Sequence, residues 1–191
     1  MDKTNSKFIK HDCLRSIAFI VGIVIISFTN IVAAASKTEI DVRVENALTT
    51  FNEKTDSGKE LANRAVGMLV FPKVYKAGIG IGGEYGEGAL LVGGKAVDYY
   101  NTTSASIGFQ LGAQARSEII LFMNQDVLTN FRNDEGWEAG VDGSVAIATF
   151  GAGGEIDSTT AQESIIGFIF SNKGLMYNLS IEGSKFTKIK K

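Results

Sequence analysis

The order of apolar and polar residues after residue 36 predicts a helical start to the domain. Apolar side chains recur there at i, i+4, i+8 and i+11, at Ile40, Val44, Leu48 and Phe51. Polar residues such as Arg43 fall on the other side. This spacing predicts an amphipathic helix.

A second helix is predicted from Lys59 to about Val70. Ser57-Gly58 punctuates the chain before it, and Pro72 is expected to end it. Leu61 and Ala65 would share one face of this helix.

Beyond Ala77 the pattern changes from helical spacing to strands rich in glycine. Glycine alternates with isoleucine from Gly78 to Gly82, and 16 of the 22 glycines lie between Gly78 and Gly154. A short helix is predicted over Asp126 to Arg132 with Asn124 as its N-cap. Turn signals, Gly93-Gly94 among them, separate further predicted strands at Ala89 to Val92, Ala96 to Tyr100, Ser106 to Leu111, Glu118 to Met123, Val141 to Thr149, Ser164 to Phe170 and Leu175 to Ile181.

Helices followed by many strands indicate an α+β fold. We expect the N-terminal helices to pack on a glycine-rich, mostly antiparallel sheet that can curl toward a barrel.

The first 35 residues have the order of a secretory signal peptide. Four basic side chains lie within residues 1–15, residues 17–26 are apolar throughout, and Ala33-Ala34-Ala35 follows. We expect cleavage after Ala35, which leaves a domain of residues 36–191 in the periplasm or secreted. The alternative is an uncleaved anchor, because the 20 residues from Ser16 to Ala35 could span a bilayer.

Composition excludes much chemistry from residues 36–191. The one histidine and the one cysteine are His11 and Cys13, and both lie in the predicted leader. Ser-His-Asp catalysis, Cys-His catalysis and Cys/His zinc sites are therefore excluded from the domain, and no cofactor is expected. A pI near 5.5 disfavours nucleic acid as a partner.

Two motifs with possible chemistry are disfavoured. Gly78, Gly80 and Gly83 spell G-x-G-x-x-G, but that motif should open a helix and here lies within a predicted strand. Carboxylates could act as acid and base in a hydrolase. The candidates are Glu84 with Glu87, and Asp134 and Glu135 with Glu138, all in segments that look like exposed turns.

Basic and aromatic residues interleave just after the second predicted helix. Lys73 and Lys76 flank Tyr75, a combination that suits an anionic membrane surface. The alternative is a solvated connector. A second positive patch, which could equally be a solubilising tail, consists of Lys185, Lys188, Lys190 and Lys191.

From Ala65 to Lys185 the sequence resembles the SYLF domain, a lipid-binding family whose eukaryotic members include actin-binding proteins. The segments that carry the resemblance are AVGMLVFPKVYKAGIGIGGEYGEGALLVGG, ASIGFQLGAQARSEIILFMN, GVDGSVAIATFGAGG and SNKGLMYNLSIEGSKF. The resemblance implies a non-enzymatic domain that binds anionic lipids with the help of an N-terminal amphipathic helix.

Carried over by position, the resemblance and the basic segment give a set of candidate lipid contacts. They are Lys73, Lys76, Tyr75, Ile40, Arg43, Val44, Leu48 and Phe51. We expect anionic phospholipids as partners, and the predicted leader argues against actin. If the helix stripe packs on the sheet instead, membrane contact would require the helix to swing out. A structural or protein-interaction module of the cell envelope is the alternative function.

Overall fold

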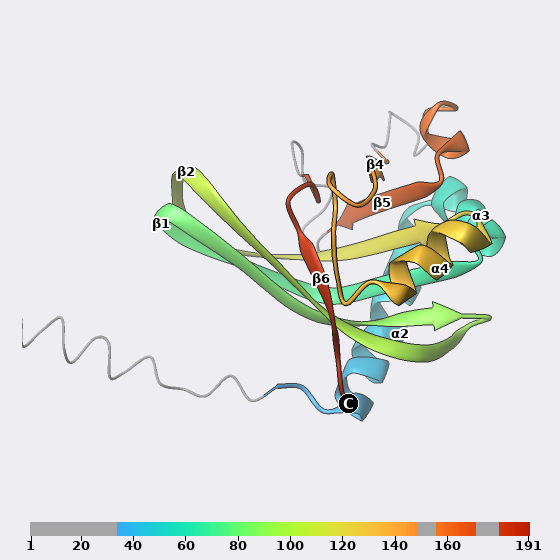
Figure 1. The fold of residues 1–191 in the computed structure, drawn as a ribbon, viewed down its shortest axis with the longest axis horizontal. Helices are drawn as coiled ribbons and strands as arrows, with labels where there is room; N and C mark the ends of the chain where they lie inside the picture. The colour runs from blue at the N-terminus through green and yellow to red at the C-terminus, as the bar shows by residue number, and fades with distance from the viewer. Residues whose placement is uncertain (1–33, 149–155, 171–179) are drawn as a thin grey trace, which may run out of the picture. The chain divides into compact units, whose positions relative to one another are not determined.

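Two long antiparallel strands form the framework of the domain. The computed structural model describes residues 34–148, 156–170 and 180–191, without the side chains of 78–80 and 106–114. Strand β1 (Gly67–Val92) pairs with β2 (Lys95–Phe122) along its length, as Figure 1 shows. Gly93 and Gly94 join them with φ of 57° and 75°, a left-handed conformation that glycine adopts without strain. The predicted turn is confirmed.

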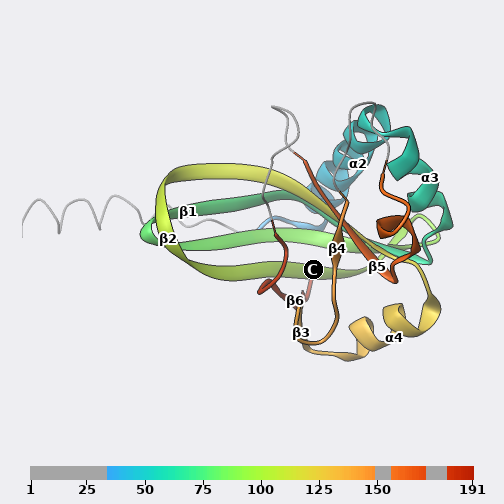
Figure 2. The ribbon, with the colours of Figure 1, turned by 90° about the horizontal axis from the view of Figure 1, so that it is seen from above.

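The β1–β2 ribbon bends near its middle and doubles back. Ile79 pairs with Leu111 but Ile81 pairs with Ile107, so three residues of β2 stand opposite one residue of β1. Such an irregularity bends a strand pair. Figure 2 shows both strands running to this bend and returning. The glycine-isoleucine alternation lies in β1, and four of the predicted strands are segments of β1 or β2.

Glycine allows close contact between the two limbs of β1, by which we mean its segments before and after the bend. A Cβ added to Gly88 would lie 2.1 Å from the carbonyl oxygen of Val70, and one added to Gly86 would lie 2.9 Å from that of Lys73. Any side chain at Gly88 would force the two backbones apart.

The remaining strands extend the sheet on the free edge of β2. Among the described residues six strands form one sheet in the order β3-β6-β2-β5-β4, with β1 on the other edge of β2. β5 (Ile165–Phe170) pairs with the end of β2, and β6 (Lys185–Ile189) pairs with its beginning. β3 (Gly136–Glu138) joins β6, and β4 (Ala146–Ile147) joins β5 in the parallel sense. The predicted α+β class, with a curled and mostly antiparallel sheet, is confirmed.

Helices cover the sheet on two sides, as Figure 2 shows. They are α2 (Lys37–Lys54), α3 (Asp56–Arg64) and α4 (Gln125–Asn133), with a 3-10 turn at Thr160–Gln162. Asn124 accepts a hydrogen bond from the amide of Val127 and caps α4 as predicted. Ser36 caps α2 by accepting from the amide of Glu39.

Alternate residues of the strands supply two separate cores. The α4 core takes Leu69 and Phe71 from β1, and its aromatic centre is Phe131, 4.8 Å from Phe122 between ring centroids. The α2 core takes Val70 from β1. Its other principal members are Ile40, Val44, Ala47, Phe51, Leu61, Ala89, Leu91, Ile119, Leu121, Ile166, Phe168 and Phe170.

Two of the predicted elements are correct over only part of their length, and one strand is unanticipated. The second helix begins at Asp56, contains Ser57-Gly58, and ends at Arg64. The apolar run after Gly67 is a strand because both of its faces are buried, which leaves no polar side to set a helical period. Of the strand predicted at Val141 to Thr149, only Ala146–Ile147 is strand among the described residues. Strand β6 has no counterpart among the predictions, and most of the predicted strand at Leu175 to Ile181 lies outside the described residues.

The contact between the limbs predicts contrasting effects of two glycine substitutions. Gly88→Ala places a methyl group against rigid backbone, so the free energy of unfolding should fall by about 1–3 kcal/mol. Gly83→Ala is the matched control, because its Cβ would lie 3.8 Å from the nearest atom, the carbonyl oxygen of Ser104, and the change should stay within about 0.5 kcal/mol. Urea unfolding measures both. Equal effects would contradict the close approach.

Candidate functional site

Lys73 and Tyr75 of β1 form an exposed pair at the surface. Lys73 Nζ lies 5.0 Å from the ring centroid of Tyr75, a cation–π distance, and Tyr75 is 51% exposed. The ladder shifts register between Phe71 and Val74, and Pro72 occupies this bulge. Ser117 donates a hydrogen bond of 2.8 Å to the carbonyl oxygen of Pro72 and fixes the bulge. A cation and an aromatic ring therefore lie side by side on a strand whose bulge is held by a hydrogen bond.

Two further exposed side chains of β1 extend this surface toward the bend. Ile81 is 72% exposed and Tyr85 is 41% exposed. They stand at alternate positions with exposed Gly83 between them, and therefore share one face of the strand. The contact between Gly86 and Lys73 brings the Tyr85 segment beside Lys73. We call Lys73, Tyr75, Ile81 and Tyr85 the outer face of β1.

Lys76 is engaged in a buried ionic network instead of facing solvent freely. Its Nζ lies 2.9 Å from Glu84 Oε1, and its side chain is 20% exposed. Arg116 donates to Glu84 at 2.6 Å and to Glu118 at 2.7 Å. This network joins the two limbs of the ribbon, because Lys76 and Glu84 come from opposite limbs of β1 and Arg116 from β2.

Glu118 is the most buried member of the ionic network. Burial raises the pKa of its carboxyl group, and the nearby Arg116 guanidinium partly opposes that rise. Its Oε1 accepts from Arg116, while Oε2 is buried without a hydrogen-bond partner among the described residues. Compensation of the buried Glu118 charge therefore depends on Arg116.

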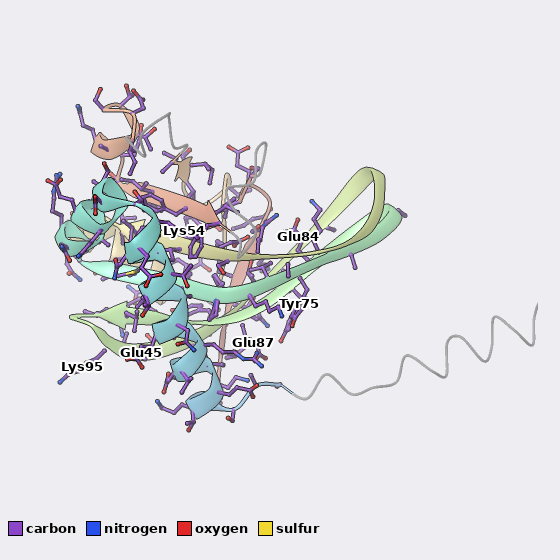
Figure 3. The ribbon with its side chains drawn as sticks, turned by 180° about the vertical axis from the view of Figure 1, so that it is seen from behind. Glu45, Lys54, Tyr75, Glu84, Glu87 and Lys95 are labelled. Atoms are coloured by element: carbon purple, nitrogen blue, oxygen red, sulfur yellow. The ribbon has the colours of Figure 1, made fainter. Side chains whose placement is uncertain are left out.

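The candidate carboxylates do not form a pair. Glu84 and Glu87 lie in β1, so their expected place in a turn is wrong. They are three residues apart in a strand and face opposite sides, as Figure 3 shows. Asp134 accepts from the amide of Gly136, which occupies one oxygen in turn formation, and Glu138 lies in β3.

The apolar stripe of α2 is packed on the sheet. Ile40, Val44 and Phe51 are 1–3% exposed, and Leu48 is half-buried. The ring centroid of Phe51 lies 4.9 Å from that of Phe168 in β5. Arg43 is exposed and bonds to Glu39 one turn earlier. Membrane contact through the stripe would therefore require α2 to leave the sheet.

Asp41 fastens the start of α2 to β2. It accepts hydrogen bonds from Lys37 at 2.7 Å and from Tyr99 at 2.6 Å. Burial raises the pKa of Asp41, but the hydrogen bonds from Lys37 and Tyr99 outweigh it and hold the pKa below its ordinary value. An ionised Asp41 therefore favours the docked helix.

The predicted C-terminal positive patch lies beside an open groove of about 1000 Å³. The carboxylate of Asp98, which lines this groove, pairs with Arg132 at 3.1 Å and with Lys188 at 2.7 Å. These ion pairs reduce the attraction that the groove can offer an anion. The groove is lined by Lys37, Ala96, Val97, Asp98, Tyr99, Arg132, Asn133, Asp134, Glu135, Thr187, Lys188, Ile189, Lys190 and Lys191.

The described residues contain neither a candidate membrane-spanning helix nor a candidate metal-binding cluster. No helix in the described part of the chain is both long and apolar enough to cross a membrane. No three His, Cys, Asp or Glu side chains gather there in a way that could hold a metal ion.

Comparison with known families gives a match to the C-terminal part of the chain. Residues 103–191 match the family model Ysc84, described as "Las17-binding protein actin regulator". No curated protein matches the chain. The match begins within β2 and includes α4 and strands β3 to β6, while the outer face of β1 precedes it.

Substitution of Arg116 tests the ionic network. Arg116→Ala leaves the buried carboxylate of Glu118 without its cation and Glu84 with Lys76 alone, so the free energy of unfolding should fall by about 3–5 kcal/mol near neutral pH. Arg43→Ala, which breaks an exposed ion pair, should cost only about 0.3–0.5 kcal/mol.

The loss should also depend on pH. Without Arg116 the pKa of Glu118 rises further above the ordinary 4.5. The folded state then binds more protons than the unfolded state, so stability falls as pH rises from the unfolded pKa through the folded one. Urea unfolding at about pH 5 and about pH 7.5 should show the larger loss at the higher pH. A loss equal to that of Arg43→Ala would contradict a structural role for the network.

Proposed function

We propose that this protein is a non-enzymatic module that binds anionic phospholipid membranes peripherally, because residues 103–191 match the model of the Ysc84 family, whose domain is also called SYLF. That match supports a lipid- or actin-related binding module. Of these two partners we propose lipid. We propose a location in the cell envelope, because residues 1–35 have the order of a secretory leader. Actin is not expected in that compartment.

The observation that carries the proposal is the exposed Lys73–Tyr75 pair. The amine lies against the aromatic ring, so both can reach the headgroup region of a bilayer together. Tyrosine favours that region because its ring is apolar and its hydroxyl is polar. Ile81, which is more exposed than Tyr75 or Tyr85, would enter the acyl boundary.

The free energies expected for membrane contact assign different roles to these side chains. Transfer of one isoleucine from water contributes about 1.5–3 kcal/mol, whereas one lysine near an anionic surface contributes about 1 kcal/mol. The apolar residues would therefore supply most of the affinity, and Lys73 would supply the preference for anionic lipid. The charge of Lys76 is matched by Glu84, so Lys76 would contribute less.

Reversal of one charge tests the electrostatic part. Lys73→Glu should weaken binding to anionic vesicles by about tenfold, because an attraction is replaced by a repulsion. Lys95→Glu is the matched control, since Lys95 is exposed at the turn far from Tyr75 in Figure 3. Vesicle co-sedimentation at low and high salt measures both, and the difference should shrink as salt screens the charges. Equal binding to neutral and anionic vesicles would refute the charge preference.

Hydrogen exchange tests which surface meets the membrane. If the outer face of β1 makes the contact, anionic vesicles should leave the amides of α2 protected, because its stripe stays on the sheet. Exchange is measured with and without vesicles. A vesicle-dependent loss of protection over Lys37–Lys54 would instead assign the contact to Ile40, Val44, Leu48 and Phe51 after release of the helix.

A further inference from the structure

Three side chains and one backbone segment meet just before α2. The amide of Ala35 donates a hydrogen bond of 3.0 Å to Glu87 Oε2. Lys191 Nζ donates to the carbonyl oxygen of Ala35 at 2.7 Å and to Glu87 Oε2 at 3.1 Å. Tyr85 donates to Glu87 Oε1 at 2.8 Å. We call Glu87, Lys191 and Tyr85 the clamp.

The clamp is built around a partly buried carboxylate. The side chains of Glu87 and Lys191 are 10% and 9% exposed. Burial raises the pKa of Glu87, but the hydrogen bonds from Tyr85 and Lys191 outweigh it and keep the pKa below its ordinary value. The pKa of Tyr85 is raised to about 12, so its hydroxyl remains a donor at neutral pH. Glu87 thus presents an ionised oxygen to the backbone nitrogen of residue 35.

The folded unit begins at the clamped residue. The chain divides between Ala34 and Ala35, and Ala35–Lys191 forms one unit. Ser36 caps α2, so Ala35 stands directly before the cap. A cut after Ala35, as the sequence pattern suggests, would remove both the N–H and the C=O that the clamp holds. A cut before Ala35 would preserve both.

We propose that the leader is removed between Ala34 and Ala35, and that Glu87 binds the α-ammonium group this releases. A leader peptidase and one water break the Ala34–Ala35 peptide bond. The hydroxyl goes to the carboxyl group of Ala34, one hydrogen goes to the nitrogen of Ala35, and that amine takes up a proton from solvent. The neutral amide donor of Ala35 becomes a charged donor facing the carboxylate of Glu87.

Two physical effects favour this product. Cleavage puts a charge on the donor as well as on the acceptor, so the amide–carboxylate hydrogen bond of Ala35 becomes a hydrogen-bonded ion pair, which gains the attraction between opposite charges. A positive charge beside the N-terminus of a helix is unfavourable, and Glu87 supplies the negative charge that offsets it at the start of α2. Small residues occupy both possible cut points, so the leader pattern alone does not choose between them. This inference is independent of lipid binding.

The position of the cut is tested on the full chain made in a secreting bacterial host. Intact mass and N-terminal sequencing of the recovered protein should both give Ala35 as the first residue. A first residue of Ser36, or an uncleaved chain starting at Met1, would overturn the proposal.

The role of Glu87 is tested by thermal unfolding of Glu87→Gln in the processed protein and in the unprocessed full chain. The substitution should lower Tm by about 2–4 °C more in the processed protein, because only in that form does Glu87 also pair with the α-ammonium group of Ala35. Glu45→Gln, at an exposed site on α2 (Figure 3), should have equal and small effects in both. Equal decreases in Tm for Glu87→Gln in both forms would show that Glu87 has a structural role only, and would overturn the proposal.

A second measurement applies if Glu87→Gln does not fold. Selective acetylation of the α-amine of the processed wild-type protein removes the positive member of the same ion pair without a substitution. Its Tm should fall by about the same 2–4 °C, and an unchanged Tm would overturn the proposal.

Discussion

The contact between the two limbs of β1 is the constraint on which the rest of the structure depends. Val70 and Gly88 approach so closely that even a methyl group on Gly88 would strike backbone. The approach brings Leu69 and Leu90, from opposite limbs, into the α4 core. If the ribbon did not bend back on itself, each limb would expose one apolar face to water. Gly86 and Gly88 are therefore required by the fold, whereas the glycines of the G-x-G-x-x-G spacing lie within a strand and do not open a helix as a dinucleotide-binding motif would.

The inside of the folded ribbon changes character along its length. Toward α4 it is filled by apolar and aromatic side chains, whereas nearer the bend Glu84, Arg116 and Glu118 cross-link the limbs. Buried ion pairs contribute little net stability, because desolvation of the charges offsets their attraction. Such groups can still fix one arrangement, since a shifted register would leave charges unpaired. Lys76 takes part in that network, which leaves Lys73 as the more accessible of the two predicted lysines.

The sequence predicts the elements whose signals are local. The spacing of α2, the Asn124 cap of α4 and the Gly93-Gly94 turn each lie within a few residues, and all three are confirmed. The pattern predicts a helix up to about Val70, but the segment from Gly67 is a strand, because a run that is buried on both faces shows no alternation of polar residues that would identify it. The bond from Arg116 to Glu84 spans 32 residues and depends on the bend, so no local pattern could reveal it.

The buried stripe of α2 limits how this helix could act at a membrane. Transfer of Ile40, Val44 and Phe51 from the sheet to lipid gains little hydrophobic free energy, because both surroundings exclude water. Departure of the helix would also expose its partners in the α2 core, Phe168 among them, and each large apolar side chain so exposed costs about 1.5–3 kcal/mol. The bond between Asp41 and Tyr99 would break as well. A membrane would have to cover the uncovered sheet too, whereas the outer face of β1 can bind without any such rearrangement.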